Sequence, residues 1–444
     1  MKILKLSTNN RGGATTAAER QAQALRQFGH QVKHLYVRQD WTCKEVTIAD
    51  DGKDVYLSAP MHQYLKTDLL FQNFLFDNRT DLSNTYMSLW RKSSPFDEML
   101  AEYIRKENFD TVHCHWTSNL ISSNLFALLE KDTVQLVMTG HDMNHFTGGC
   151  HYNAGCEGFK SNCQSCSQIK TNDSALLSSS LNEKINAYKK VMPKFIFPSD
   201  WLNKEYLSSS VAQLLGPNSS QVIRNCIDTD FFSPVSEYER VALRQVMGFS
   251  NDEVLIVSGA ENNNEIRKGF NYFERAFKTL NTSLYGSTFD KEVTFVAFGG
   301  GDHKLTPTHK NVKYRHLGVL TEKQVRDLFR ISDLLAFTSI EENFANVILE
   351  ALMCACPVLG LSIGGIPDIV TSGTNGHLVS ELSETEYSTV LTKLVIEGQL
   401  AILKEKTKEW RAENFKKYSY PMIAKQLEEF YETLIQGSEN GQPV

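Results

Sequence analysis

Two glutamates, Glu342 and Glu350, stand eight positions apart at the edge of an apolar segment. Glu342 lies in a polar stretch beside Phe344, whereas Glu350 lies within 347–353, where apolar residues recur at close to helical spacing. The pattern predicts a loop at Glu342 and a helix that starts near Asn346, a residue type favoured at the N-cap. Because a carboxylate accepts hydrogen bonds from adjacent hydroxyls, the pair predicts a site for a sugar or a ribose.

The length and composition of the chain set limits on its class. Its 444 residues predict two to three domains, and 41% hydrophobic with 22% charged residues is typical of a globular protein. Acidic residues outnumber basic ones, 52 to 46, which argues against nucleic acid as the main partner. The apolar start is short and interrupted by Lys5, and no run approaches the roughly 20 residues of a spanning helix. We therefore expect a cytoplasmic protein, with peripheral attachment at the inner face of a membrane left open.

The first half of the chain begins with a strand–turn–helix–strand pattern. A predicted strand at 2–8 is followed by the turn at Gly12 and Gly13, a helix to Gly29 and a strand at 31–37. This order is typical of a doubly wound α/β domain. Further strands are predicted at 111–115 and 135–139, and each ends in polar residues. Ligands in such sheets bind at the carboxyl ends of the strands.

The same pattern restarts in the second half, which predicts a second doubly wound domain. The junction lies near 222–234, and the last helix, at about 421–435, is amphipathic. The strands predicted for the second half are 254–259, 293–299, 334–338 and 357–360, with a helix at 322–331 among them.

The segments around the two glutamates resemble a known enzyme family. Residues 337–345, 350–360 and 364–368, which contain Phe344, Pro357 and a Gly-Gly-Ile-Pro-Asp run, resemble the donor site of retaining glycosyltransferases of glycosyltransferase family 4, or "group 1". Members of that family carry two glutamates separated by seven residues. The resemblance implies the GT-B fold, an α/β architecture with two doubly wound Rossmann-like domains facing across a cleft.

The resemblance also implies a division of the chain into three parts. Residues 1–220 would form the acceptor-side domain, with a cysteine-rich insert at 148–168. Residues 221–415 would form the nucleotide-sugar domain, and residues 416–444 would form a helix that crosses back to the first domain.

The same resemblance implies roles for residues of the donor site. Glu342 would hold sugar hydroxyls, and Glu350 would hold the ribose. Residues 314–318 resemble the loop that covers the nucleotide base. The further positions predicted to bind the donor are Asn343, Phe344, Ala345, His316 and Leu317.

Cationic and glycine-rich segments predict how the diphosphate is bound. Without a metal, cationic side chains must stabilise the charge that grows on a leaving diphosphate, and Arg267 and Lys268 are the candidates. The family has a lysine before a glycine here, but its usual arginine five residues earlier is Asn263 in this chain. Glycines at Gly12 and Gly13 let a helix start approach a phosphate.

Histidines end two strands of the first half. His141, which Asp142 follows, matches the family's active-site histidine and would contact the reacting sugar or the acceptor hydroxyl. His113 and His115 end another strand, and they are either ordinary strand-end residues or acceptor contacts.

Four cysteines lie within seventeen residues: Cys150, Cys156, Cys163 and Cys166. The cytosol disfavours disulfides, and the spacing, ending in Cys-x-x-Cys, matches a structural zinc site. Free or redox-active thiols are the alternative.

The resemblance implies a retaining hexosyltransferase, and together with the residues above it predicts a metal-independent enzyme without a catalytic cofactor. We expect it to move a sugar from a nucleoside-diphosphate donor to a saccharide hydroxyl, free or lipid-linked. The expected setting is surface polysaccharide biosynthesis: capsule, O-antigen or exopolysaccharide. The alternatives are a nucleotide-sugar 2-epimerase of the same fold and a non-catalytic GT-B binding subunit.

Overall fold

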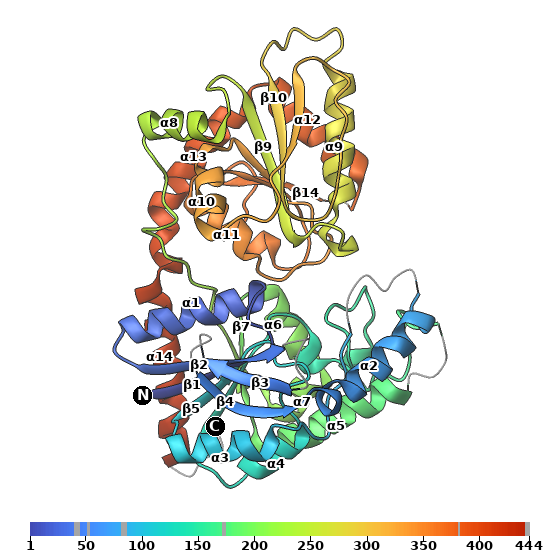
Figure 1. Cartoon of the computed structure of the whole chain (residues 1–444), viewed down its shortest axis with the longest axis vertical. Helices are drawn as coiled ribbons and strands as arrows, with labels where there is room; N and C mark the ends of the chain where they lie inside the picture. The colour runs from blue at the N-terminus through green and yellow to red at the C-terminus, as the bar shows by residue number, and fades with distance from the viewer. Residues whose placement is uncertain (40–44, 51–53, 81–86, 171–174, 381, 440–444) are drawn as a thin grey trace. The chain divides into compact units, whose positions relative to one another are not determined.

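The computed structural model describes residues 1–39, 45–50, 54–80, 87–170, 175–380 and 382–439 (Figure 1). The chain forms two compact units, Met1–Cys226 with Tyr420–Val444, and Ile227–Ser419. The borders predicted from the sequence are 220/221 and 415/416, and the observed borders lie within six positions of them.

The first unit is built on a twisted eight-stranded sheet with the order β4-β3-β2-β1-β5-β6-β7-β8. Neighbouring strands in the part β2-β1-β5-β6-β7-β8 are parallel. At the other edge, β3 pairs antiparallel with both β2 and β4. Its strands are β1 (Lys2–Ser7), β2 (Gln31–Gln39), β3 (Glu45–Asp50), β4 (Asp54–Pro60), β5 (Thr111–Cys114), β6 (Gln135–Thr139), β7 (Lys194–Phe197) and β8 (Ser220–Val222).

Helices cover this sheet and form a layered α/β structure. Ser122 and Ser199 cap two of them, because each hydroxyl accepts a hydrogen bond from a backbone N–H in the first helical turn. The helices of the unit are α1 (Gly13–Gln27), α2 (Met61–Asn78), α3 (Asp97–Glu107), α4 (Ser123–Leu129), α5 (Ala175–Val191), α6 (Asp200–Leu207), α7 (Ser210–Leu215) and α14 (Tyr420–Glu439).

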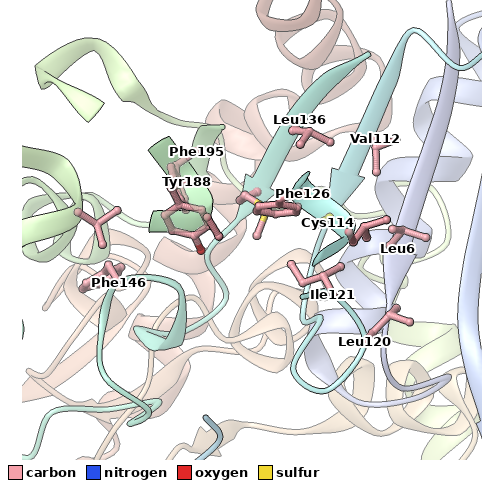
Figure 2. Close-up of a cluster of buried hydrophobic side chains, with 14 of the residues drawn as sticks. Leu6, Val112, Cys114, Leu120, Ile121, Phe126, Leu136, Phe146, Tyr188 and Phe195 are labelled. Atoms are coloured by element: carbon pink, nitrogen blue, oxygen red, sulfur yellow. The ribbon is translucent and has the colours of Figure 1, made fainter. Parts of the chain in front are cut away.

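A continuous apolar core lies against one face of the first sheet (Figure 2). The labelled side chains come from strands, helices and the loop after β5, and they include Leu6, Val112, Phe126, Tyr188 and Phe195. Aromatic rings pack edge-on or tilted, as at Tyr188 and Phe195, whose centroids lie 5.7 Å apart. This burial fixes the positions of β1, β5 and β6, the strands that lead to the predicted site residues of this unit.

The last helix, α14, packs on α1 at a separate apolar cluster. Ile423, Leu427 and Tyr431 of α14 are fully buried there beside Ile3 and Leu25. The C-terminal helix is therefore part of the first unit, although the second unit separates it from the rest of that unit in the sequence.

The second unit is a smaller doubly wound domain. Its six strands are all parallel, in the order β11-β10-β9-β12-β13-β14. They are nearly continuous apolar segments because helices cover both faces. The strands are β9 (Val254–Asn262), β10 (Val293–Gly300), β11 (Val312–His316), β12 (Leu334–Ala336), β13 (Val358–Leu361) and β14 (Gly376–Val379).

The helices of the second unit start with well-formed caps. Capping boxes are present at Ser236 with Glu239 and at Thr321 with Gln324. The helices are α8 (Glu237–Met247), α9 (Phe270–Ser283), α10 (Glu322–Ile331), α11 (Asn346–Met353), α12 (Glu384–Ile396) and α13 (Gln399–Asn414). A mainly parallel sheet in the first unit and a fully parallel one in the second, both covered by helices, confirm the predicted α/β architecture of two Rossmann-like domains.

Within the described ranges, no helix is long and apolar enough to cross a bilayer.

Candidate functional site

Lys268, Arg267 and Glu342 come together at the carboxyl end of the second unit's sheet. Lys268 ends a short 3₁₀ turn, Ile266–Lys268, that follows β9, and Glu342 lies in the loop between β12 and α11. The Lys268 Nζ atom donates to Glu342 Oε2 at 2.9 Å, and Arg267 Nη1 lies 3.5 Å from the same oxygen. β9 and β12 are neighbours in the sheet, so their ends bring together residues 74 positions apart in the sequence.

A glycine allows the two loops to meet. Gly269 has a φ of 62°, and a Cβ atom there would lie 2.0 Å from the carbonyl oxygen of Thr338. Thr338 Oγ1 donates to the Lys268 carbonyl at 2.8 Å, and the Ile340 N–H donates to the Arg267 carbonyl at 2.8 Å. Glycine is therefore required after Lys268, because only a residue without a Cβ atom lets the backbone there lie against the loop that follows β12.

The charges in this cluster are strongly coupled. Burial alone would raise the pKa of Glu342, but Lys268, Arg267 and the Asn343 N–H outweigh it and hold the pKa below its ordinary value. Glu342 is consequently a carboxylate whose side chain is only 12% exposed. Arg267 also donates to Glu265 Oε1 at 2.7 Å, so its charge is shared between two carboxylates.

Glu341, which precedes the predicted glutamate, is a member of the cluster that the sequence analysis missed. Burial, together with nearby Glu265, raises the pKa of Glu341 to about 7, although Arg267 opposes the rise. Its Oε2 atom is buried without a hydrogen-bond partner. Glu341 stands next to Glu342 in the sequence, but its burial near Arg267 does not show there.

Glu350 lies on α11, which begins at Asn346. Asn346 is the first helical residue, and Ala345 stands at the cap position without a side-chain cap bond, so the predicted N-cap role of Asn346 is wrong. Glu350 is half-buried in the second turn of the helix. Phe344 and Ala345, in the loop before α11, are buried, and the Gly365 N–H donates to the Glu342 carbonyl at 3.3 Å. The glycine-rich segment therefore contacts the glutamate loop.

His316 and Leu317 lie at the end of β11, at the same edge of the sheet. The structure corrects the prediction that residues 314–318 form a loop, because Val312–His316 is a strand paired with β10. The chain leaves the sheet only after the Leu317 N–H donates to the Ala297 carbonyl at 2.8 Å. The Nε2 atom of His316 is buried without a hydrogen-bond partner, which leaves a polar atom for a ligand.

Asn263 occupies the position where the family usually has an arginine. Its side-chain amide donates to the Phe298 carbonyl at 2.9 Å, and its backbone N–H donates to the Gly300 carbonyl at 2.9 Å. The residue is 5% exposed and holds the ends of β9 and β10 together. Asn263 is thus a structural residue, and Arg267 is the cation that lies beside Lys268.

In the first unit, the predicted glycines lie at the start of α1. Gly12 has a φ of 97° and precedes the helix, and Gly13 is its first residue. A Cβ atom on Gly13 would meet nothing within 4 Å, so Gly12 is the position whose backbone requires glycine.

His141 and Asp142 follow β6 in a buried polar cluster. Asp142 Oδ2 accepts from His151 Nδ1 at 2.7 Å and from Trp116 Nε1 at 3.0 Å, and Oδ1 accepts from the Asn144 N–H at 2.9 Å. Burial opposes the charge on Asp142, but His151, the Asn144 N–H and nearby His145 lower its pKa to about 2. Asp142 is therefore an anchor for the loop after β6.

The His141 ring is held by another histidine instead of by Asp142. Its Nε2 atom lies 2.9 Å from Nδ1 of His115, and the two rings stack at 5.2 Å. Burial lowers the pKa of His141 to about 3, which makes it a neutral imidazole. His113 and His115 are fully buried and hydrogen-bonded within the protein. These contacts favour the interpretation of both as ordinary strand-end residues over acceptor contacts.

The four clustered cysteines line one pocket of the first unit. The other residues that line it are Gly148, Gly149, Asn153, Phe159, Ser165, Gln168 and Leu177. Backbone N–H groups of Gly158, Gly148 and Gln168 approach the sulfurs of Cys156, Cys163 and Cys166, respectively. All four are free thiols. In the described part of the chain, no group of three or more metal-binding side chains is arranged to hold an ion as it stands.

Residues 252–396 match the family model described as glycosyl transferases group 1. The solved structure of Anabaena HepE in complex with UDP superposes with a TM-score of 0.60 at 16% identity, over 98% of this chain and 100% of that chain. This likeness shows the GT-B fold.

Curated relatives match parts of the chain. The D-inositol 3-phosphate glycosyltransferase of Corynebacterium jeikeium is 30% identical over 128 residues, 29% of this chain and 30% of that protein. WcaC of Escherichia coli, named as a colanic acid biosynthesis glycosyl transferase, is 24% identical over 325 residues, 70% of each protein. The chain thus spans about a third of the first of these relatives and more than two thirds of the second.

Residues 252–396 therefore carry the likeness to the group 1 glycosyltransferases, and the chain as a whole has the GT-B fold. The part matched by the family model contains Lys268, Glu342 and Glu350, the residues from which the family was predicted.

Proposed function

We propose that the protein is a retaining, metal-independent glycosyltransferase that transfers a sugar from a nucleoside diphosphate to a saccharide hydroxyl. The observation that carries the proposal is the contact of Lys268 and Arg267 with Glu342 at the carboxyl end of the second sheet. The cluster combines cations suited to a diphosphate with a carboxylate suited to sugar hydroxyls.

The cluster supports a mechanism in which Lys268 and Arg267 stabilise the leaving group. As the bond between the anomeric carbon and the phosphate oxygen breaks, negative charge grows on the diphosphate, and fixed cations lower the barrier. The acceptor oxygen attacks from the same face of the sugar, and the leaving phosphate takes the acceptor's proton. Glu342 holds the sugar hydroxyls during this step.

The remaining predicted residues bind the ends of the substrates. Glu350 holds the ribose hydroxyls, and Asn343, Phe344, Ala345, His316 and Leu317 surround the nucleotide and the donor sugar. In the first unit, Gly12 and Gly13 present a helix start to a phosphate, and His141 contacts the sugar or the acceptor hydroxyl.

The relatives support the substrate class and the setting. HepE was solved with UDP and with UDP-glucose, and WcaC is named for colanic acid biosynthesis. We accordingly propose a nucleoside-diphosphate sugar donor and a saccharide acceptor of a bacterial surface polysaccharide. We propose cytoplasmic action, with contact at the inner face of the membrane where the acceptor is lipid-linked.

A panel of UDP-, GDP- and ADP-sugars, incubated with and without saccharide acceptors, tests this function. Formation of a glycosidic bond only when acceptor is present supports the proposal. Isomerisation of the donor without acceptor identifies a 2-epimerase, and binding without turnover identifies a non-catalytic subunit. Either of these two results overturns the proposal.

A structural zinc ion bound by Cys150, Cys156, Cys163 and Cys166 is a second part of the proposal. Four thiols around one pocket, with backbone N–H donors at three sulfurs, fit the donor set of a Cys₄ site. Lys184 lies close enough to favour the thiolate of Cys163, although burial raises the pKa of that thiol to about 11.

Binding of zinc requires rearrangement of these thiols within the pocket, because the described side chains do not yet form a metal-binding group. The backbone around them is already specialised: a Cβ atom on Gly148 would lie 2.6 Å from the Leu177 carbonyl oxygen. We assign the ion a structural role, since a Cys₄ site leaves no open position for a substrate.

A further inference from the structure

A buried lysine lies at the centre of the first unit's polar network. Lys5 is on β1 and has no exposed surface. Its Nζ atom lies 2.9 Å from Gln21 Oε1, 3.0 Å from His115 Nε2 and 3.3 Å from His113 Nδ1. An ammonium group has three donors and no acceptor, so these three atoms match its hydrogen-bonding capacity.

The direction of each hydrogen bond follows from this arrangement. Because the Lys5 ammonium only donates, His115 Nε2 must accept, and the proton of the neutral His115 ring lies on Nδ1. That atom lies 2.9 Å from His141 Nε2, so His141 Nε2 also accepts. The proton of the neutral His141 ring is then on Nδ1.

A second set of hydrogen bonds runs from Lys5 through His113. His113 Nδ1 lies 2.6 Å from the Tyr431 hydroxyl on α14, and His113 Nε2 lies 2.6 Å from Thr139 Oγ1 on β6. Because the Lys5 ammonium donates to Nδ1, the proton of the neutral His113 ring lies on Nε2, which donates to Thr139 Oγ1. The branch therefore holds β1, β6 and α14 around Lys5.

Electrostatics agree with neutral imidazoles around one cation. Burial, followed by the charge of Lys5, lowers the pKa of both His113 and His115 well below the ordinary value. Burial also lowers the pKa of Lys5 to about 7, with Glu19 and the Cys226 thiol opposing and Arg26 reinforcing the shift. Below neutral pH, Lys5 is thus the group in this cluster that carries the charge.

We propose that Lys5 is a positioning residue that, through His115, fixes His141 as the tautomer protonated on Nδ1. In this state Nε2 of His141 accepts from His115, and Nδ1 of His141 carries the proton of the ring. His141 then acts as a hydrogen-bond donor and not as a general base. The consequence for catalysis rests on the proposed function of His141.

Nitrogen-15 NMR of the imidazole rings in the whole protein, at about pH 6 where Lys5 is charged, tests the assignment. The His141 signals are identified by their loss in His141→Gln. We expect a protonated-type Nδ1 and an unprotonated-type Nε2 in the wild-type protein. A proton on Nε2 of wild-type His141 overturns the proposal without any variant having to fold.

Lys5→Met removes the donor, and we expect a mixture of His141 tautomers and a fall of about tenfold or more in kcat/KM. Lys131→Met, at an exposed position, is the matched control and should change neither the His141 tautomer nor kcat/KM. An unchanged His141 tautomer in folded Lys5→Met overturns the role of Lys5. If the wild-type tautomer is as expected but no sugar is transferred, the proposed function fails and the tautomer assignment stands.

Discussion

Lys268 Nζ lies 2.9 Å from Glu342 Oε2, and the two side chains neutralise each other at the carboxyl end of the second sheet. Their side chains are 20% and 12% exposed, so water screens the pair only in part. In the proposed reaction, each exchanges this contact for one with the donor: the lysine with the diphosphate and the glutamate with sugar hydroxyls.

Lys268→Ala should lower kcat by at least about tenfold, equal to about 1.4 kcal/mol of barrier, because the charge is needed most as the diphosphate leaves. Steady-state kinetics measures the effect, and circular dichroism checks the fold. Lys278→Ala, which removes a lysine 64% exposed on α9, is the control and should keep the wild-type rate. A near-normal rate for Lys268→Ala would show that Arg267 alone serves the leaving group.

Glu350→Ala should weaken binding of the nucleoside diphosphate by about 1.5–3 kcal/mol, because the ribose loses a charged acceptor. Isothermal titration calorimetry gives the affinity directly. Glu413→Ala, at an exposed position of α13, is the matched control. Equal affinities in the two folded variants would remove Glu350 from the site.

The cysteine pocket should hold one zinc ion per chain in protein purified without added metal. Cys163→Ser should lose the metal and increase hydrogen exchange over residues 150–166, while nucleotide binding by the second unit stays the same. Ser165→Ala changes a pocket residue that is not a thiol and should keep the ion. Metal-free, fully active protein with four titratable thiols at these positions would contradict the zinc proposal.

Asp142 should make the first unit sensitive to acid. Its pKa of about 2 lies below the ordinary 3.8, so its stabilisation is complete above about pH 4 and is lost as the pH falls toward 2. The shift corresponds to about 2 kcal/mol. Denaturation followed by tryptophan fluorescence should show this loss in the wild-type protein and in Asp302→Asn, an exposed control. Asp142→Asn should show a smaller loss, and an equal one would contradict the assignment.

Most of the fold was predictable because the central strands of both sheets are short apolar segments with clear ends in the sequence. Apolar strands that end in glycine or polar residues, such as 254–259 and 293–299, match β9 and β10 closely. The antiparallel edge formed by β3 and β4 was not predicted. Its strands lie in a stretch of weak periodicity, and edge strands need less continuous apolar sequence than central parallel ones.

Site residues could be predicted where their neighbours in the sequence form a recognisable pattern. They could not be predicted where their role depends on burial and on contacts that only the fold creates. Glu342 and Lys268 stood out by their neighbours in the sequence. Lys5 appeared only as an interruption of an apolar strand, because nothing local shows that His113 and His115 lie beside it. Asn263 likewise looked like a missing arginine until its contact with the Phe298 carbonyl was known.

The configuration of the new glycosidic bond tests the central claim most directly. The product of the wild-type protein with its preferred nucleotide sugar and acceptor, formed in the presence of EDTA, is examined by proton NMR at the anomeric position. We predict the same anomeric configuration as in the donor and a reaction rate that EDTA does not reduce. An inverted product, or complete dependence on added magnesium, would contradict the proposed mechanism.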